Sequence, residues 1–424
     1  MSEVTRPATV VLVGCGVRGQ NYASYALAHP DRLKIVGIAE PREYQRNLVK
    51  THHGIEDDKV FTDWTSLVSQ PKFADGVIIA THTRLHQAPA VAFAKKGYHM
   101  MQETPMALTM EGCQEVYNAC VENQVMFCSC HVLRYSPAAS KIKELIDSGA
   151  VGDVVNIQHI EMYGTIYSTH ATVRGYHRRQ EMCGAFVLAK SCHDLDLISY
   201  WMGDKKCTSL SAFGHLSHFT KANKPPEASN RCWECPVERR CPFSAIKNYI
   251  EPVKNGFTGF PVNNVSDVLD VEHVTEAIKT GPFGKCVYDM DNDVQNHLVI
   301  GLQFEDGATA THTVVAFSEL NGTRETKIFG TMGEIRCRFG EPLQYTDFRT
   351  RKTTTYTLEA PGQDVPEPLK HYWGSDYNVI HCFTKALREN NAASIQTDVA
   401  VSLASHQMAF AADQALTHKT VVKL

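Results

Sequence analysis

The sequence has no excess of basic charge and no long apolar segment. Its 424 residues include 42 Lys and Arg against 46 Asp and Glu, which gives a formal net charge of −4. No apolar run approaches the roughly 20 residues that a membrane helix needs, and no Lys/Arg-rich tail is present that would attract nucleic acid. We therefore expect neither a membrane nor a nucleic acid as a partner.

A secretory signal and a regular cysteine framework are also missing. Residues 1–8 are polar and carry no apolar stretch, so no signal peptide is expected. The 14 cysteines are scattered, and several, such as Cys128 and Cys130, lie inside apolar runs. This pattern is typical of reduced thiols and predicts a cytoplasmic protein.

The chain contains enough apolar residues for two globular domains. Hydrophobic residues make up 43% and charged residues 21%, as in ordinary soluble enzymes. In the first part, apolar strands alternate with amphipathic helices, which predicts βαβ units and a parallel sheet. The expected strands are 8–13, 33–39, 76–80, 99–102 and 125–130. We assign residues 1–130 to a Rossmann domain.

The second part, residues 131–424, has a different texture. Strand-like segments with a hairpin signature at Asp306-Gly307 predict an α/β domain with a large, mostly antiparallel open sheet. Two polar insertions, 221–254 and 262–284, interrupt it. Helices expected within about 376–418 could pack back toward the Rossmann domain.

A glycine-rich motif follows the first strand and precedes a helix. Gly14, Gly16 and Gly19 form a GxGxxG pattern, in which the first glycine permits a tight turn, the second lets the backbone approach a pyrophosphate, and the third lets the helix pack closely. The helix N-terminus at Val17 and Arg18 would supply free N–H groups to the phosphates. A purely structural turn is the alternative.

Glu40 ends the second expected strand, 21 residues after Gly19. A carboxylate there can accept both ribose hydroxyls and repels a 2′-phosphate. The pattern therefore predicts NAD as the cofactor. Arg42 is close in sequence and could accept a 2′-phosphate, which leaves NADP as an alternative.

Four later segments match motifs of one known family. Residues 80–86 look like A-T-P-N-x-x-H, and residues 97–107 look like G-K-H-V-x-x-E-K-P-x-A. Residues 148–152 look like S-G-x-I-G, and residues 184–196 match a helix that carries H-x-x-D. The chain thus resembles the glucose–fructose oxidoreductase / inositol dehydrogenase / rhizopine-catabolism (Gfo/Idh/MocA) family, in a branch with a Lys-Ser-Cys-His-Asp-Leu-Asp motif and a cysteine cluster.

The resemblance implies hydride transfer between NAD(P) and a sugar, polyol or related carbonyl, in a homodimer or homotetramer. It implies cofactor contacts from Thr81, His86, Glu103 and Thr104, and we expect Pro105 to form a turn in the cis form at the cofactor. Two other functions stay open: a glycoside hydrolase that retains its NAD and works by oxidation and elimination, and a ligand sensor without turnover. The sequence departs from the family at Thr104, where the E-K-P lysine is absent.

The proton chemistry of such a reaction needs an acid–base group, and His193 is the candidate. Lys190, His193 and Asp196 are spaced by three residues and would share one helix face. Asp196 could orient the imidazole, and Lys190 could lower its pKa and supply the missing ammonium. The alternative is a surface helix with solvated charges.

Further polar residues are candidates for substrate contacts and for a metal. His131, Arg134 and Tyr135 lie at the domain crossover, and Arg174 and Tyr176 are additional substrate candidates.

Three cysteines, Cys232, Cys235 and Cys241, have a metal-knuckle spacing that suits zinc. A fourth ligand would have to come from elsewhere, such as Cys207, His215 or His218. Reduced thiols that pack a loop are the alternative.

Overall fold

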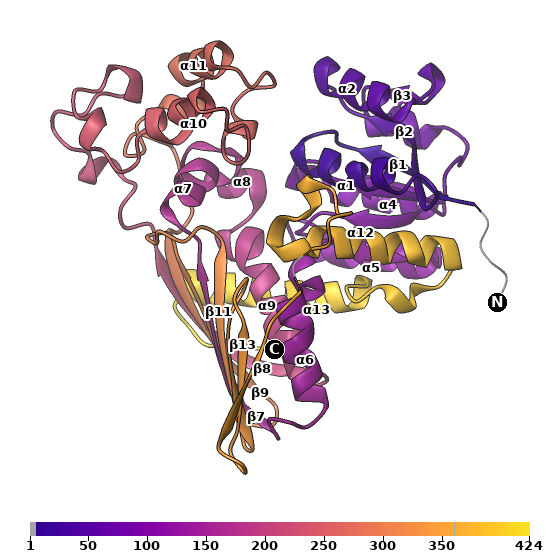
Figure 1. The fold of residues 1–424 in the computed structure, drawn as a ribbon, viewed down its shortest axis with the longest axis vertical. Helices are drawn as coiled ribbons and strands as arrows, with labels where there is room; N and C mark the ends of the chain where they lie inside the picture. The colour runs from indigo at the N-terminus through magenta and orange to yellow at the C-terminus, as the bar shows by residue number, and fades with distance from the viewer. Residues whose placement is uncertain (1–5, 360) are drawn as a thin grey trace.

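The computed structural model describes residues 6–359 and 361–424 and consists of two sheets with helices between them (Figure 1). Residues 1–5, part of the segment in which no signal peptide was expected, lie outside the described residues. No helix of the described chain is long and apolar enough to cross a membrane.

The first sheet has six parallel strands in the order β3-β2-β1-β4-β5-β6. The strands are β1 (Ala8–Val13), β2 (Leu33–Ala39), β3 (Val60–Phe61), β4 (Gly76–Ile79), β5 (His99–Gln102) and β6 (Phe127–Ser129). The connecting helices are α1 (Val17–Ala28), α2 (Glu43–His53), α3 (Trp64–Ser69), α4 (Gln87–Lys95) and α5 (Met110–Glu122). This order is that of a Rossmann domain, as predicted.

The second sheet has nine strands in the order β14-β13-β12-β11-β7-β10-β9-β8-β15. They are β7 (Val154–Met162), β8 (Cys207–His215), β9 (His297–Phe304), β10 (Thr309–Val315), β11 (Thr323–Gly330), β12 (Gly333–Arg338), β13 (Leu343–Asp347), β14 (Lys352–Tyr356) and β15 (Val422–Lys423). β7 and β10 are parallel, and the other paired strands are antiparallel. The prediction of a mostly antiparallel sheet is confirmed.

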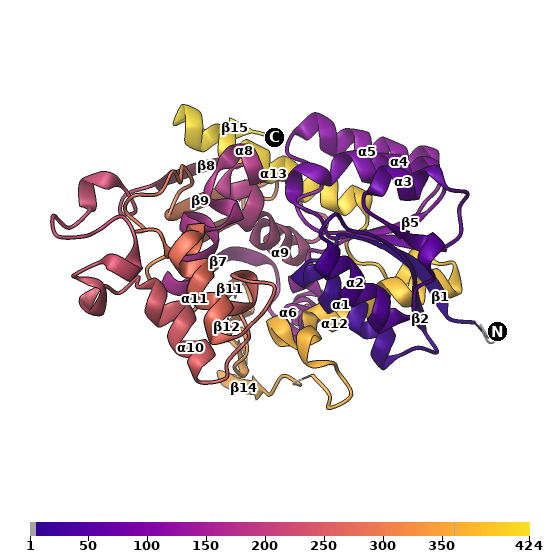
Figure 2. The same ribbon diagram turned by 90° about the horizontal axis from the view of Figure 1, so that it is seen from above.

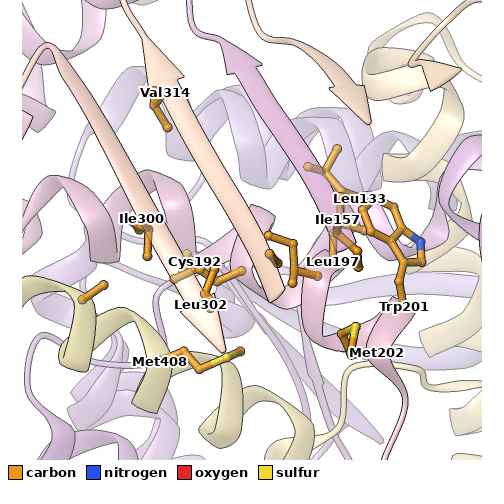
Figure 3. Packing of buried hydrophobic residues seen from close by; sticks show 14 of the residues in the cluster. Leu133, Ile157, Cys192, Leu197, Trp201, Met202, Ile300, Leu302, Val314 and Met408 are labelled. Atoms are coloured by element: carbon orange, nitrogen blue, oxygen red, sulfur yellow. The ribbon is translucent and has the colours of Figure 1, made fainter. Parts of the chain in front are cut away.

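Helices cover one face of this sheet. They are α6 (Pro137–Asp147), α9 (Cys192–Met202) and α13 (Val399–His418). The short helices α7 (Thr165–Ser168) and α8 (Gln180–Cys183) lie above the end of the sheet (Figure 1). Residues of β9 alternate between exposed and buried, as expected for a strand with one covered face. Figure 3 shows Cys192, Leu197 and Trp201 of α9 packed among apolar side chains of the sheet. This packing places α9 between the two sheets (Figure 2).

Helix α12 (His371–Glu389) returns to the Rossmann domain and packs on α1 and β1. Its Val379, Ile380 and Phe383 belong to the same buried cluster as Val10 and Leu12 of β1. The polar insertions form a separate lobe with α10 (Glu251–Lys254) and α11 (Val271–Thr280), above α7 in Figure 1. This lobe has only small apolar clusters of its own.

Candidate active site

The glycine motif forms the loop between β1 and α1. Gly14 has φ +93°, and a Cβ there would lie 2.5 Å from the Ala80 carbonyl oxygen; a Cβ at Gly19 would lie 2.1 Å from the Gly14 oxygen. Both positions therefore need glycine. Helix α1 begins at Val17 without a side-chain cap from Gly16, so its first N–H groups are available to an anion.

Glu40 lies directly beside this loop. Its carboxylate accepts hydrogen bonds from the Cys15 backbone N–H (2.8 Å) and from Arg42 Nε (2.9 Å). Burial raises the pKa of Glu40, but the hydrogen bonds from Arg42 and Cys15 outweigh burial and hold this pKa below its usual value. The carboxylate is therefore charged at neutral pH, at the position where a ribose diol is expected.

The side chain of Arg18 makes ion pairs that the sequence analysis did not foresee, while its backbone N–H lies in the first turn of α1, as the motif predicts. Its guanidinium binds Glu103 (2.7 Å) and the fully buried Asp376 of α12 (2.7 Å), and it also contacts the Tyr22 hydroxyl. Burial raises the pKa of Glu103, but Arg18 outweighs this effect and keeps that pKa lowered. Arg18 and Glu103 thus join the glycine loop to α12, because two carboxylates hold the guanidinium. Their contacts with the cofactor stay a prediction.

His86 is also a structural link and not a free cofactor ligand. Its Nδ1 lies 2.7 Å from the Pro105 carbonyl oxygen and its Nε2 lies 3.0 Å from the Thr81 carbonyl oxygen. The neutral ring can donate to one of these two carbonyl oxygens, and with the side chain buried His86 lies between the loops after β4 and β5. The Thr104-Pro105 peptide is cis, as expected. Thr104 and Thr81 stay at the carboxyl edge of the Rossmann sheet, where cofactors bind.

His193 lies at the start of α9 and reaches this edge. Its Nε2 is 3.0 Å from Thr104 Oγ1, and its ring centroid is 5.6 Å from that of His131. Burial, followed by His131, Arg324 and Lys190, lowers the pKa of His193 well below its usual value, although Asp194 opposes the shift. A neutral imidazole is therefore present at neutral pH and can accept a proton.

Asp196 does not orient His193, so that prediction is wrong. Its carboxylate makes a two-pronged ion pair with Arg134 (2.6 and 2.9 Å) and accepts a hydrogen bond from Ser405 Oγ (2.9 Å). His131 Nδ1 lies 3.4 Å away, so Asp196 faces His131 and not His193. The buried guanidinium attracts this carboxylate more strongly than a neutral imidazole can.

The same contacts remove two substrate candidates. Arg134 is buried and committed to Asp196, and the Tyr135 hydroxyl lies 3.0 Å from Thr397 Oγ1 and accepts the Gln396 backbone N–H. Both side chains serve the packing of the segment before α13. Of the three crossover candidates, only His131 lies beside His193.

Lys190 is in a π-helical turn, Val187–Ser191, that precedes α9. Its Nζ lies over the rings of Tyr167 (4.9 Å) and Tyr163 (5.5 Å). The structure thus brings Lys190 close enough to His193 to lower its pKa, as expected, and adds two tyrosines that the sequence analysis did not single out.

Glu161, Asp194 and Arg324 form a buried network that the sequence analysis missed. Arg324 binds Glu161 (2.7 Å) and Asp194 (3.0 Å), and His159 lies 2.8 Å from Asp194. A signal existed, because His159 and Glu161 share the buried face of β7 with Ile157, and charged residues are rare on such a face.

One buried group within the described chain has metal-like spacing. The possible ligand atoms of His159, Asp194 and His312 lie within 4.8 Å of one another. Arg324 already supplies the cation that faces Asp194, so we assign no metal here.

Arg174 and Tyr176 have different surroundings in the structure. The guanidinium of Arg174 is fully buried in the insertion lobe and donates to the Lys285 and Phe243 carbonyl oxygens, so its assignment to the substrate is corrected. Tyr176 stacks on His82 at 4.1 Å, beside the loop after β4. It stays a candidate for substrate contacts.

The three predicted cysteine ligands line one cavity of about 340 Å³ in the insertion lobe. A fourth thiol, Cys286, lines it as well. Of the expected fourth ligands, Cys207 lies on β8, His215 ends that strand, and His218 Nε2 lies 3.1 Å from the Tyr288 hydroxyl. Cys286 was missed because it lies beyond the second insertion.

Comparisons with known proteins agree with this architecture. A model of an oxidoreductase family with an NAD-binding Rossmann fold matches residues 8–131, and the model of that family's C-terminal alpha/beta domain matches residues 143–424. The putative oxidoreductase YteT of Bacillus subtilis (strain 168) is 23% identical over 389 residues, which are 84% of this chain and 86% of that protein.

Two further similarities involve proteins with named carbohydrate ligands or substrates. The 2,7-anhydro-N-acetylneuraminate hydratase of Escherichia coli (strain K12) is 28% identical over 207 residues, 49% of this chain and 53% of that protein. Levoglucosan dehydrogenase in complex with NADH and levoglucosan has the same fold, with a TM-score of 0.70 at 18% identity over 99% of both chains. Taken with the family models, these findings show that the chain belongs to the Gfo/Idh/MocA family of NAD-binding oxidoreductases.

Proposed function

We propose that the protein is an NAD-dependent dehydrogenase or reductase that acts on a hydroxyl or ketone of a sugar or polyol, with His193 as its acid–base group. The observation that carries this proposal is the contact between His193 Nε2 and Thr104 Oγ1 (3.0 Å), which joins the second domain to the edge where the Rossmann sheet binds NAD. The carbohydrate ligands of the related proteins support the substrate class.

The chain's own residues account for the proton transfers. Bound NAD would accept or return the hydride. The neutral His193 can accept a hydroxyl proton directly or through the Thr104 hydroxyl, which bonds to it. Lys190 lies one helical turn before His193, with its Nζ over the Tyr167 ring (4.9 Å), and in this proposal its positive charge replaces that of the absent family lysine. In the direction of reduction, the imidazole first takes up a proton from solvent and then donates it to the carbonyl oxygen that receives the hydride.

Glu40 favours NAD over NADP in this proposal. A charged carboxylate beside the glycine loop repels a 2′-phosphate. Its ion pair with Arg42 weakens the discrimination, because Arg42 could turn toward a phosphate.

A redox-neutral reaction that retains NAD is the second candidate. The related hydratase, which matches about half of this chain, is the observation that favours it.

One assay separates the two functions. Sugars, polyols and anhydrosugars are offered with NAD or NADP, and both the NADH absorbance and the products are measured. Net NADH formation with a polyol or sugar supports the dehydrogenase, whereas product without net NADH supports the redox-neutral reaction. If no compound gives NADH or product, the proposed activity is contradicted. If turnover is faster with NADP than with NAD, the proposed cofactor preference is contradicted.

The role of His193 has a direct test. His193→Ala should lower kcat by about 10²–10⁴-fold, the range for one acid–base group. NAD affinity should change little, because the glycine loop lies in the other domain. His273→Ala, at an exposed histidine of α11, is the control. Full activity of His193→Ala would transfer the role to His131.

We also propose that the protein is a homo-oligomer in the cytoplasm. The uncovered face of the large sheet supports the first part, since it carries the exposed Phe213 (65%) and Val299 (38%) side by side. The 14 free cysteines support the second part. Cysteines that react with a thiol reagent only after the native protein has been reduced would show disulfides, and would contradict a reducing compartment.

A further inference from the structure

The insertion lobe brings together four cysteines from two separate segments. Cys232 and Cys235 flank a tight turn, Cys232–Glu234, and Cys241 follows the next turn, Glu238–Arg240. An isolated bridge between Arg231 and Lys285 places Cys286 next to this segment, and the Cys286 backbone N–H donates to the Asn230 oxygen (2.8 Å). All four thiols line the same cavity of about 340 Å³.

The spacing of the thiols is too wide for a single zinc ion. Zn–S bonds of about 2.3 Å hold the four sulfurs of a zinc site within about 4 Å of one another. Among the described residues, three or more potential ligand atoms lie within 4.8 Å of one another only at His159, Asp194 and His312. No three of the cysteine sulfurs are therefore that close, and they surround a space larger than one ion.

A buried arginine indicates that this space holds negative charge. Arg174 is 0% exposed, and no carboxylate forms an ion pair with it in the described chain. Its Nη2 lies 3.5 Å from Cys232 Sγ, and its Nη1 is buried without a hydrogen-bond partner in the same residues. A buried guanidinium needs a counter-charge, since burial without one is costly.

We propose that Cys232, Cys235, Cys241 and Cys286 hold a [4Fe–4S] cluster, with Arg174 as its hydrogen-bonding counter-charge. Four cysteine thiolates are the usual ligands of such a cluster. Each thiolate binds a different iron, so the sulfurs lie farther apart than around zinc, and the cluster fills the space between them. The cluster and its thiolates carry net negative charge, which the N–H groups of Arg174 meet.

The cluster has a structural purpose in this lobe. The apolar clusters around it are small, and domains with small cores commonly need a metal or a disulfide. The lobe reaches the Rossmann domain, where Gln45 Nε2 donates to Asp267 Oδ1 (2.7 Å). Arg174 ties the lobe to the segment that carries Tyr176, which stacks on His82. The cluster therefore holds the segment that lies against the cofactor side.

The test is metal analysis of the full chain, produced with ample iron and purified without oxygen. We expect about four iron atoms and four acid-labile sulfides per chain, with a broad visible absorbance that bleaches on reduction and an EPR signal in the reduced state. One zinc per chain without sulfide overturns the assignment, and so does protein without iron.

Single variants identify the ligands. Cys286→Ser should lose most of the iron, sulfide and visible absorbance, whereas Cys207→Ser, at a half-buried cysteine of β8, should keep them. NAD binding and circular dichroism report whether Cys286→Ser remains folded. If it does not fold, the iron and sulfide content of the wild-type chain still tests the cluster. Full cluster content in Cys286→Ser overturns its role as a ligand.

Arg174 has a separate readout. Arg174→Gln removes the positive charge beside Cys232, so the reduction potential of the cluster should become more negative. An unchanged potential with a full complement of iron overturns the role of Arg174.

Discussion

Thr104 occupies the position at which the resemblance implies a lysine, and its hydroxyl is bonded to His193. Thr104→Val keeps the shape of the side chain and removes only this hydroxyl. Because one neutral hydrogen bond contributes about 0.5–1.5 kcal/mol, we expect a loss of kcat of about two- to tenfold and a shift in the pH profile, measured with the substrate found in the assay above.

Thr104→Ser is the matched control, because it retains the hydroxyl and should stay near the wild-type rate. Equal rates for the valine and serine variants would mean that the hydroxyl takes no part in positioning or proton transfer.

Whether a site residue could be predicted depended on the distance to its partners along the chain. Glu40 and the glycines act on neighbours within one βαβ unit, so a local motif suffices to identify them. Asp196 and Arg134 could not be assigned in this way. Asp196 also binds Ser405, and Arg134 contacts the Gln396 carbonyl oxygen, from segments roughly 200 residues or more away. Spacing on one helix contains no information about such partners.

At the scale of elements, strands with continuous apolar runs or clear alternation were predictable to within a few residues. β1 and β9 are examples, because burial on one or both faces determines their composition. β3 and β15 are only two residues long and carry no periodicity. The insertion lobe was recognised only as polar, because its small cores are assembled from short helices.

The β1–α1 loop allows a paired test of two glycines. Gly19→Ala should destabilise the Rossmann domain, since its Cβ would lie 2.1 Å from the Gly14 oxygen and the helix would have to move. At Gly16 a Cβ would meet only Arg42 Nη2, at 3.5 Å, so Gly16→Ala should fold normally. It should nevertheless bind NAD at least tenfold more weakly, because the methyl group points to the expected pyrophosphate.

Thermal unfolding and NAD titration of both variants check this prediction. Unimpaired NAD binding by Gly16→Ala would place the pyrophosphate elsewhere, and an unchanged midpoint for Gly19→Ala would mean that the helix adjusts without cost.

At the scale of the whole molecule, the open face of the large sheet is the expected subunit interface. Phe213, Val299, Thr313 and Ile160 form one row across β8, β9, β10 and β7. Phe213→Asp places a charge in this row and should shift a dimer or tetramer toward smaller species by sedimentation analysis. Lys95, an exposed residue of α4 in the Rossmann domain, provides the control Lys95→Asp. A monomeric wild type at micromolar concentration would contradict the proposal.

Acid should destabilise the fold through histidines that are buried or, for His177 and His193, half-buried. Burial is the largest cause that lowers the pKa of His86, His131, His170, His177, His193, His312 and His406. In the unfolded chain these imidazoles bind protons as the pH falls below about 6.5, whereas in the folded chain they stay neutral. Stability is therefore complete above pH 6.5 and falls by up to about 1.4 kcal/mol per pH unit for each such histidine.

Urea unfolding at pH 7.5, 6.0 and 5.0 measures this slope. The ring nitrogens of His312 have no hydrogen-bond partner in the described chain, and burial lowers its pKa to about 3. His312→Phe should therefore flatten the slope without removing a hydrogen bond. A slope that is the same in this variant would mean that His312 is already protonated in the folded protein.

Because α12 packs on the Rossmann domain, this domain cannot finish folding until α12 has been synthesised. The last strand of the first sheet ends at Ser129, but the apolar residues of α12 that cover β1 and α1 begin only after His371, roughly 240 residues later. At about 5–20 residues per second, a ribosome needs about 12–50 s to make this stretch. During that time Val10 and Leu12 lack their partners, and Arg18 lacks Asp376. The cofactor domain is encoded first and completed nearly last, so its nascent form presents an apolar surface that a chaperone can bind.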